Sequence, residues 1–556
     1  MYWSSIQWVF LNPIHVLKYA VDAVWTHRQS IKIWTRDWTA FFLSHLLIFS
    51  IYLSTYIILS DYISWWWSKV YILHLSYLLF QSFVRSYYPP GPPPMAILGN
   101  SPFINVLAPE TTFLEYREIY GPVFTLHLSK PTVILANFES CKEALVHNSK
   151  KTEGRSSSES FVLFTGDRVN GDGVILAMGE KWRTMKDEIK KFMGGKYRSG
   201  QMDESVLRHT SELEEELKAL SKEGAQIDLR EPLSGAIANV IQEVTIGKTF
   251  KYQEEEFQTQ LSNINTVVKE IMTPEVFFVN CYPWLRFLPD GILRGWTSYK
   301  KSGFRLQEWF KTILHEHQKT PEEQREGDFM SHMIEQSEEG RQYSDLSIIL
   351  TCGDMWTGGM ETTTTTLRWG IIYLLQNPEV QNKCREEIKK VFGDVKPDMT
   401  RMKETPFVQA TLSEIQRLAN VLPWAIPHKT FEPTRVGDHT IPIDTEIIPA
   451  LGALLCDPLV FQNPKEFQPE RFLDEFGKYK KIDEFSPFGM GPRRCLGENL
   501  ARTELYLIFT RLLQQFEFYL KDSDPIPVAE RVIGGITAPP KPYTLRVKYL
   551  GEENLQ

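Results

Sequence analysis

The sequence has few cysteines for its length, and they are not placed as paired motifs. Six are spread over 556 residues without a Cys-x-x-Cys pair: Cys141, Cys281, Cys352, Cys384, Cys456 and Cys495. This spacing argues against a zinc site and a disulfide framework, and it favours a reducing compartment for the catalytic part. The chain also has no excess of positive charge: its net charge is -8. The sequence therefore predicts no nucleic-acid partner.

Charged side chains are absent from residues 38–60, a stretch of 23 positions. That is long enough to cross a bilayer as a helix, and it is too long and too far from the start for a cleaved signal peptide. A second apolar stretch, 62–84, is interrupted by Lys69. Residues 1–88 are therefore predicted to form a membrane anchor. Either one span is followed by an interfacial helix, or two spans form a hairpin, which the basic residues before the first span favour.

A run of prolines at 89–94 separates this region from the rest of the chain. Such a run forms neither helix nor sheet and acts as a stiff hinge. Residues 95–556 contain no further linker or repeat and are predicted to form one domain. Short β-type runs occur at 123–128 and 132–135, whereas 212–222, 304–318 and 346–375 have helical patterns. The predicted fold class is mainly α with a minor β part.

The chemistry centres on a glycine-rich loop at 488–497, in which Arg493 and Arg494 directly precede Cys495. Apolar residues follow at helical spacing, so the loop opens a helix. A helix N-terminus favours a thiolate, and glycines allow close backbone approach. The alternative interpretation is a buried structural cysteine, which is the usual state of a free thiol.

A second motif lies inside the long helical stretch 346–375, where Gly358 and Gly359 are followed by Glu361 and Thr362. Two glycines cost a helix roughly 1 kcal/mol each relative to alanine. They allow a bulky group to pack flat against the backbone, and an acid and a hydroxyl beside it could relay protons. The alternative is a solvated acid on a threonine-rich helix face.

Two further motifs combine a carboxylate with arginines. Glu414 and Arg417 share a helix face at i,i+3, and the loop Pro469-Glu470-Arg471-Phe472 could bring Arg471 to Glu414. A pair like this is usually an exposed one of little energetic value. A buried carboxylate with two arginines would instead hold the core together, since buried charges need partners.

The four motifs, in this order, are similar to the signatures of the cytochrome P450 family, over about residues 89–550. The anchor and the proline hinge resemble microsomal members, and the sequence after Gly497 resembles the animal clan of drug-metabolising enzymes and steroid hydroxylases. The resemblance implies the P450 fold and a monooxygenase that inserts one oxygen atom of O2 into a hydrophobic substrate. It also implies haem b as cofactor and NADPH as the electron source through NADPH–cytochrome P450 reductase.

The resemblance assigns roles to individual residues. Cys495 would be the thiolate ligand of the haem iron. Phe488 would pack beside the sulfur, and the backbone N–H of Gly497 would tune it. Glu361 and Thr362 would deliver protons to the oxygen that binds there.

Other matching residues would hold the haem propionates: Arg493, His428 and Trp182. The sequence departs from the family pattern at Lys186, where an arginine usually stands. Lysine keeps the charge but lacks the planar fork of arginine, so either Lys186 makes a weaker contact or Arg183 replaces it. Glu414, Arg417 and Arg471 would stabilise the fold around the haem.

The resemblance implies substrate-facing positions near 156–170 and 270–285, on the helix before Gly358, and at 421–426 and 534–536, most of them apolar. They favour a sterol, a steroid or another lipid. The overall sequence resembles a nematode steroid-hormone P450 that oxidises the side chain of a 3-keto-sterol. Alternatives are a xenobiotic or fatty-acid hydroxylase, a haem-thiolate isomerase or dehydratase, and a non-catalytic lipid sensor.

A group of basic residues is expected near the thiolate side of the haem: Lys181, Arg183, Lys186, Lys190, Lys191, Arg493 and Arg494. Such a patch suits an acidic electron donor, namely the reductase and, as a further partner, cytochrome b5. A solvated helix face is the alternative. The anchor implies contact with membrane lipid, and the family implies the endoplasmic reticulum membrane with a cytoplasmic catalytic domain.

Overall fold

The computed structural model describes residues 36–50 and 85–551, except 40, 44, 48, 49, 96, 97, 196–200, 223, 326, 339, 341, 342, 533 and 534. The predicted second span, 62–84, lies outside the described residues, and the predicted first span, 38–60, lies partly outside them. Within the described part, no helix combines the length and the apolar character that crossing a bilayer requires.

Helices make up most of the described chain, which confirms the predicted mainly α class. The α-helices are α4 (Pro109–Tyr120), α5 (Phe138–Lys142), α6 (Ser149–Thr152), α7 (Glu159–Val162), α8 (Gly179–Gly195), α9 (Gln201–Lys222), α10 (Arg230–Ile246), α11 (Glu255–Glu270), α12 (Pro274–Cys281), α13 (Arg294–Lys319), α14 (Phe329–Glu338), α15 (Asp345–Gln376), α16 (Pro378–Phe392), α17 (Pro406–Ala419), α18 (Leu451–Leu455) and α19 (Glu498–Gln515). Short 3-10 helices are η1 (Ser101–Phe103), η3 (Pro283–Phe287), η4 (Glu322–Gln324), η5 (Met402–Glu404) and η6 (Pro469–Phe472), and η2 (Glu143–His147) is a π-helix.

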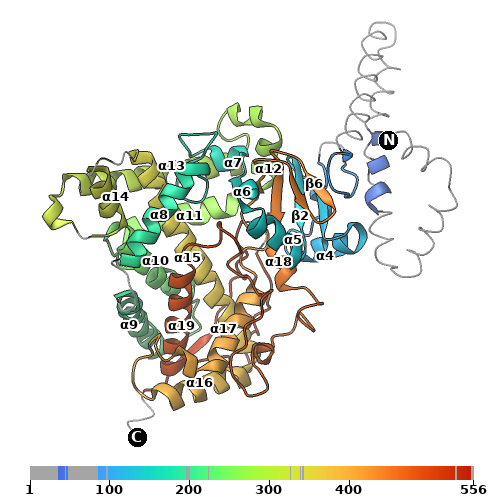
Figure 1. Cartoon of the computed structure of the whole chain (residues 1–556). Coiled ribbons are helices and arrows are strands. Elements are labelled where there is room, and N and C mark those ends of the chain that lie inside the picture. Colours follow the sequence, from blue (N-terminus) through green and yellow to red (C-terminus); the bar gives the residue numbers. More distant parts are fainter. Residues whose placement is uncertain are drawn as a thin grey trace, which may run out of the picture.

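The strands are short and form three small sheets. They are β1 (Val123–His127), β2 (Pro131–Leu135), β3 (Gly154–Arg155), β4 (His428–Lys429), β5 (Thr434–Val436), β6 (His439–Ile441), β7 (Glu446–Pro449), β8 (Phe516–Tyr519) and β9 (Arg546–Tyr549). The largest sheet has the order β1-β2-β7-β4-β3, and its β2–β7 pairing is parallel. Figure 1 shows β2 and β6 at one side of the molecule with α4, α5 and α18, and most of the other helices at the other side.

Local sequence explains where several helices begin and end. Ser344 caps α15, because its hydroxyl accepts a hydrogen bond from the Ser347 N–H at 3.1 Å. Pro406 begins α17, where its missing N–H costs nothing, and Asn420 ends that helix in the left-handed conformation. Gly247 ends α10 in the same way. These signals lie in the sequence itself, and α15 corresponds to the helical segment predicted at 346–375.

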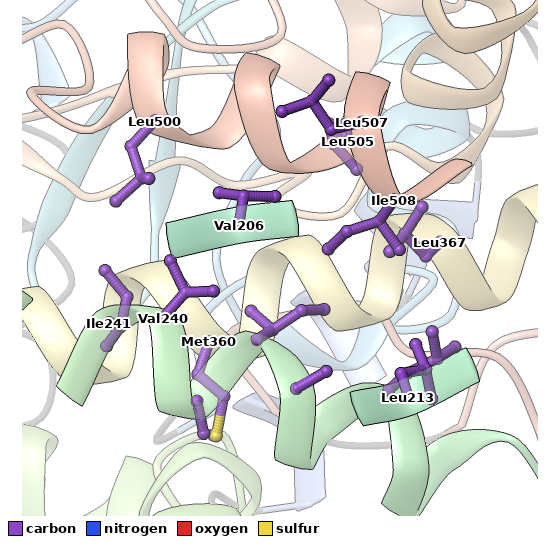
Figure 2. Close-up of a cluster of buried hydrophobic side chains, with 14 of the residues drawn as sticks. Val206, Leu213, Val240, Ile241, Met360, Leu367, Leu500, Leu505, Leu507 and Ile508 are labelled. Atoms are coloured by element: carbon purple, nitrogen blue, oxygen red, sulfur yellow. The ribbon is translucent and has the colours of Figure 1, made fainter. Parts of the chain in front are cut away.

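The main core lies where α9, α10, α15 and α19 meet. Figure 2 shows side chains from these four helices pointing toward one another, among them Val206, Ile241, Met360 and Leu500. Met360 directly precedes Glu361, and Leu500 lies five residues after Cys495. The same packed core therefore fixes the two segments that carry the predicted chemistry relative to each other.

Candidate functional site

The cysteine loop is closed by its own backbone just before α19. The Cys495 N–H donates to the Phe488 carbonyl oxygen at 3.0 Å, and the Arg494 N–H donates to that of Gly491 at 3.1 Å. Gly491 has a φ of 74°, and a Cβ there would lie 1.9 Å from the Leu145 carbonyl oxygen. Only glycine allows this approach, which presses the loop against η2.

Cys495 differs from the other cysteines because its side chain is exposed, whereas the remaining five are buried or half-buried. Burial by the surrounding loop nevertheless raises the pKa of its thiol. The Gly497 N–H, which hydrogen-bonds the sulfur, and the Arg494 charge lower that pKa, and Glu498 raises it. The thiol is thus reachable by a ligand yet held in surroundings of low polarity.

Two arginines beside this loop lack a carboxylate partner. Arg493 donates to the carbonyl oxygens of Glu153 at 2.9 Å and Ala177 at 2.6 Å, and Arg155 donates to that of Ile175 at 3.0 Å. Neither arginine forms an ion pair with a described residue. Burial lowers the pKa of Arg155 to about 10, and burial together with the Arg155 charge lowers the pKa of Arg493 to about 8. Arg155 is buried and Arg493 half-buried, and neither makes an ion pair with a described residue, so together they suit an anion.

Trp182 has two cations close to its ring at the same place. The Arg493 guanidinium carbon lies 3.8 Å from the centre of its ring, and the Lys186 Nζ lies 4.5 Å from it. The Trp182 side chain is only 3% exposed, and its indole N–H has no hydrogen-bond partner in the part of the chain that the structure covers. The indole nitrogen itself is not fully buried, so its N–H remains accessible to an acceptor from outside the chain.

His428 joins this group through the sheet, because β4 pairs with β3 and places His428 opposite Arg155. Its Nδ1 lies 2.9 Å from the Thr152 carbonyl oxygen. Burial and the charges of Arg155 and Arg493 lower the pKa of the imidazole well below its usual value, so that it is neutral at physiological pH.

Lys186, which replaces the arginine of the family pattern, forms a hydrogen bond within the protein. Its Nζ donates to the Pro492 carbonyl oxygen at 2.6 Å, which ties α8 to the cysteine loop. Arg183, the alternative, pairs with Glu153 at 2.5 Å. The Glu153 charge raises the pKa of Arg493, but the Glu153 carboxylate makes its ion pair with Arg183 and not with Arg493. A contact of Lys186 with a propionate stays a prediction.

The second motif lies on α15, and its two glycines have different surroundings. A Cβ at Gly358 would meet nothing within 4 Å, whereas one at Gly359 would lie 2.4 Å from Ile241 Cγ1 on α10. Gly359 thus permits close packing of two helices, and Gly358 leaves one face of α15 open. Thr362 lies one turn further on that face, and its hydroxyl donates to the Gly358 carbonyl oxygen at 2.7 Å.

Glu361 points toward the C-terminal segment of the chain. Its Oε1 accepts hydrogen bonds from Thr365 at 3.3 Å and Thr537 at 3.5 Å. Burial raises the pKa of this carboxyl, and the charges of Arg230 and Arg368 oppose that shift. The carboxyl therefore holds a proton more readily than an exposed glutamate does.

The structure brings Glu414, Arg417 and Arg471 together. Arg417 donates to both oxygens of Glu414 at 2.7 and 2.8 Å, and Arg471 donates to Oε1 at 3.0 Å. The side chains of Glu414 and Arg417 are fully buried. Arg417 also donates to the carbonyl oxygens of Leu455 and Pro464, so it joins α17 to the loop that leads to η6.

Two of the segments expected to face the substrate also lie side by side. The Ser160 N–H on α7 donates to the Asn280 Oδ1 on α12 at 2.9 Å, and the Asn280 amide donates back to the Ser160 hydroxyl at 3.0 Å. The Ile536 N–H donates to the Val268 carbonyl oxygen at 3.1 Å, which places the C-terminal segment against α11. Gly534, in the same predicted group, lies outside the described residues.

Most of the predicted basic patch is paired with acidic side chains. Lys181 pairs with Asp172, Lys191 with Glu188 at 3.0 Å, and Arg494 with Glu498, in addition to the Arg183 pair. Lys190 forms no ion pair with any residue that the structure describes. The positive potential of this face is therefore weaker than the count of basic residues suggests.

Two residues that shape this region were missed in the sequence. Arg155 stands alone after Gly154, and its role appears only when β3 pairs with β4. Asp354 on α15 accepts hydrogen bonds from the N–H groups of Val174 at 2.8 Å and Ile175 at 2.9 Å, and burial raises its pKa to about 7. It anchors the loop between α7 and α8 to the central helix. A single aspartate four residues before Gly358 carries no motif that would have identified it.

Comparison with known proteins gives a consistent result. The family model for Cytochrome P450 matches residues 89–547. The chain is 65% identical over 534 residues to a Caenorhabditis elegans protein named 3-ketosteroid oxygenase, which covers 94% of this chain and 92% of that protein. It is 33% identical to cytochrome P450 2G1 of Oryctolagus cuniculus, over 81% of this chain and 92% of that protein. It is also 30% identical to human cytochrome P450 2U1, over 83% and 89% of the two chains. The family match spans every candidate residue described above.

Proposed function

This chain belongs to the cytochrome P450 family, and we propose that it is a monooxygenase whose substrate is a 3-ketosteroid or a closely related sterol. The family makes it an oxidoreductase that uses haem with a thiolate-ligated iron and O2. The observation that carries the substrate class is the 65% identity, over 94% of the chain, to a protein named 3-ketosteroid oxygenase. Two relatives at 33% and 30% identity have names that specify no substrate.

The residues around the cysteine loop fit a haem. A haem offers an iron that needs an axial ligand and two propionates that need cations and hydrogen-bond donors. Cys495 is an exposed thiol just before α19, and Arg155 (buried) and Arg493 (half-buried) are cations that form no ion pair with a described residue. Trp182 adds an unpartnered N–H beside Arg493. In this proposal Cys495 binds the iron, and Arg493, Arg155, Trp182 and the neutral His428 hold the propionates.

When a haem is bound through a thiolate, its iron activates dioxygen for insertion of one oxygen atom into a C–H bond. Cys495 must be deprotonated for this role. The Gly497 N–H and the N-terminal end of α19 stabilise the negative sulfur, and so does Arg494. Phe488 fixes the thiol by accepting the Cys495 N–H through its backbone, and its ring lies 5.0 Å from the Arg502 guanidinium.

Thr362 and Glu361, which both lie on α15, are the proposed proton donors. Thr362 Oγ1 is placed over the open face at Gly358 and can turn from the Gly358 carbonyl to a water or substrate oxygen. Glu361 holds its proton because it is buried, and Thr365 and Thr537 orient it. Since the carboxyl points toward Thr537, delivery from Glu361 to Thr362 requires a rotation of its side chain or an intervening water.

Electrons are proposed to come from NADPH through NADPH–cytochrome P450 reductase, with cytochrome b5 as a further donor. Lys190 and Arg494 are the exposed cations that suit such a docking face, and the ion pairs on α8 limit its strength. Residues 1–88 are proposed to anchor the catalytic domain in the endoplasmic reticulum membrane through one or two spans. Turnover at rising salt tests the docking face, because screening weakens an interaction between exposed charges.

The function is tested with the full-length holoenzyme, the reductase, NADPH and O2 on a panel of 3-ketosteroids and fatty acids. We expect an oxygenated product from at least one 3-ketosteroid and a substrate-induced change in the haem spectrum. Oxidation of fatty acids alone would contradict the substrate class. Product formation without O2 would contradict the monooxygenase assignment.

The ligand assignment is tested separately with Cys495→Ser and the control Cys281→Ser, whose side chain is half-buried on α12. The reduced carbonyl complex of a thiolate-ligated haem has a characteristic red-shifted Soret band. We expect Cys495→Ser to lose that band and Cys281→Ser to keep it. Persistence of the band in Cys495→Ser would refute the assignment.

A further inference from the structure

A groove between α11 and α13 lies apart from the residues assigned to the haem, and we propose that it binds an amphipathic carboxylate of the fatty-acid type. The groove has a volume of ≈ 610 Å³, which is within the range of pockets that hold small ligands. Its wall combines a polar floor, cationic side chains and aromatic rings, and no function described above uses any of them.

The floor consists of two amide side chains with unused hydrogen-bonding groups. Gln260 is 8% exposed and Asn263 is 6% exposed, and the Asn263 amide donates to Gln260 Oε1 at 3.1 Å. Gln260 Nε2 and Asn263 Oδ1 then have no partner among the described residues, and neither is a fully buried atom, so both remain reachable from the groove. Nearly buried amides usually have their partners. A carboxylate in the groove would accept from the Gln260 N–H groups.

The charge around the groove favours an anion, although the whole chain has a net charge of -8. Lys300 and Lys301 share Asp290, at 2.8 and 3.3 Å. Arg305 is exposed and forms no ion pair within the described part of the chain. The acid of the groove, Glu308, is paired with a lysine on the next turn. A guanidinium therefore remains free to pair with an acidic head group.

The rest of the wall accepts an apolar chain. Phe304 is 43% exposed, and its ring is held edge-on against Phe164 at 5.2 Å between centroids. Trp309 also lines the groove but is only 8% exposed, because its indole N–H donates to Glu256 at 2.7 Å and its ring packs against Phe310 and Trp356. The apolar surface of the groove therefore comes mainly from Phe304. A small inorganic anion would leave this surface uncovered, and a neutral lipid would leave Arg305 without a partner. An apolar chain with one carboxylate satisfies both.

The proposal is tested by photolabelling of the full-length holoenzyme in phosphatidylcholine nanodiscs with a diazirine analogue of dodecanoic acid. Saturating imidazole covers the haem site, and labelled peptides are located by mass spectrometry. We expect labels on α11 and α13, and about tenfold weaker labelling in Arg305→Gln, because a charged hydrogen bond is lost. Gln260→Met should weaken labelling as well, and Lys319→Gln, at the far end of α13, should not.

The haem spectrum of each variant serves as the folding control. The matching dodecanol analogue should label α11 and α13 much less than the acid does. Labelling that imidazole abolishes, or that Arg305→Gln and Gln260→Met leave unchanged, would overturn the proposal. The proposal would also be wrong if the protein bound anionic vesicles through Arg305 while the acid and alcohol probes labelled it equally. Arg305 would then contact the membrane surface instead.

Discussion

Replacing Glu504 with glutamine should make the protein more stable at neutral pH. Glu504 lies on α19 and is fully buried, and burial raises the pKa of its carboxyl from 4.5 to about 8. Its Oε2 accepts a hydrogen bond from Thr363 at 3.2 Å, and Oε1 has no partner among the described residues. The folded protein therefore favours the neutral form of this group, which glutamine imitates.

The magnitude follows from linkage. The pKa is higher in the folded state than in the unfolded chain, so the stability that the protonated group confers is complete below pH 4.5 and is lost as the pH rises toward 8. At about 1.4 kcal/mol per pH unit, the loss by pH 7 is about 3 kcal/mol. Glu504→Gln does not titrate and should retain this stability.

The assay is urea unfolding of the holoenzyme, followed by circular dichroism between pH 5.5 and 8.5. The urea midpoint of Glu504→Gln should exceed that of the wild type by a margin that grows with pH up to about 8. Glu243→Gln is the control, and it should lower the urea midpoint instead of raising it. His209, Arg208 and Ser205 lower the pKa of Glu243 to about 2, so the folded protein favours the ionised form that glutamine cannot replace. A difference between Glu504→Gln and the wild type that is constant with pH would refute the reasoning.

Three further predictions concern other parts of the structure. Arg417→Ala should destabilise the protein by about 3–5 kcal/mol in urea unfolding, because a buried carboxylate loses the closer of its two arginines. Gly359→Ala should cost about 1–3 kcal/mol, because its Cβ would overlap Ile241, whereas Gly358→Ala should leave the thermal midpoint unchanged or higher and reduce turnover. Asp354→Ala should speed amide exchange at Val174 and Ile175, since these two N–H groups lose their acceptor, and Asp354→Asn should do so less.

Much of the site could be predicted because its residues are close in sequence. The loop from Phe488 to Gly497 carries its own glycines and leads directly into a helix, so its shape is largely local. Glu414 and Arg417 meet because i,i+3 spacing places them on one helix face. The helical pattern of 346–375 corresponds to α15, which begins one residue earlier and ends one residue later.

Other features depend on which segments pack together. Arg155 reaches the anion site only because β3 pairs with β4, although 271 residues separate Arg155 and Ile426, whose carbonyl it also binds. The partner of Arg183 is Glu153, and the partner of Lys186 is a backbone carbonyl 306 residues away. Basic residues counted along a sequence do not reveal the acids that neutralise them.

The sequence by itself determined the helical class, the family and the cysteine loop, because helix periodicity, caps and a ten-residue motif are short-range properties. The tertiary structure decided which cations lack a counter-ion, which face of α15 stays open at Gly358, and where Glu361 points. It also created the groove between α11 and α13, which has no motif in the chain. Burial and the partners of a charge depend on residues hundreds of positions away, and only the packed fold brings these together.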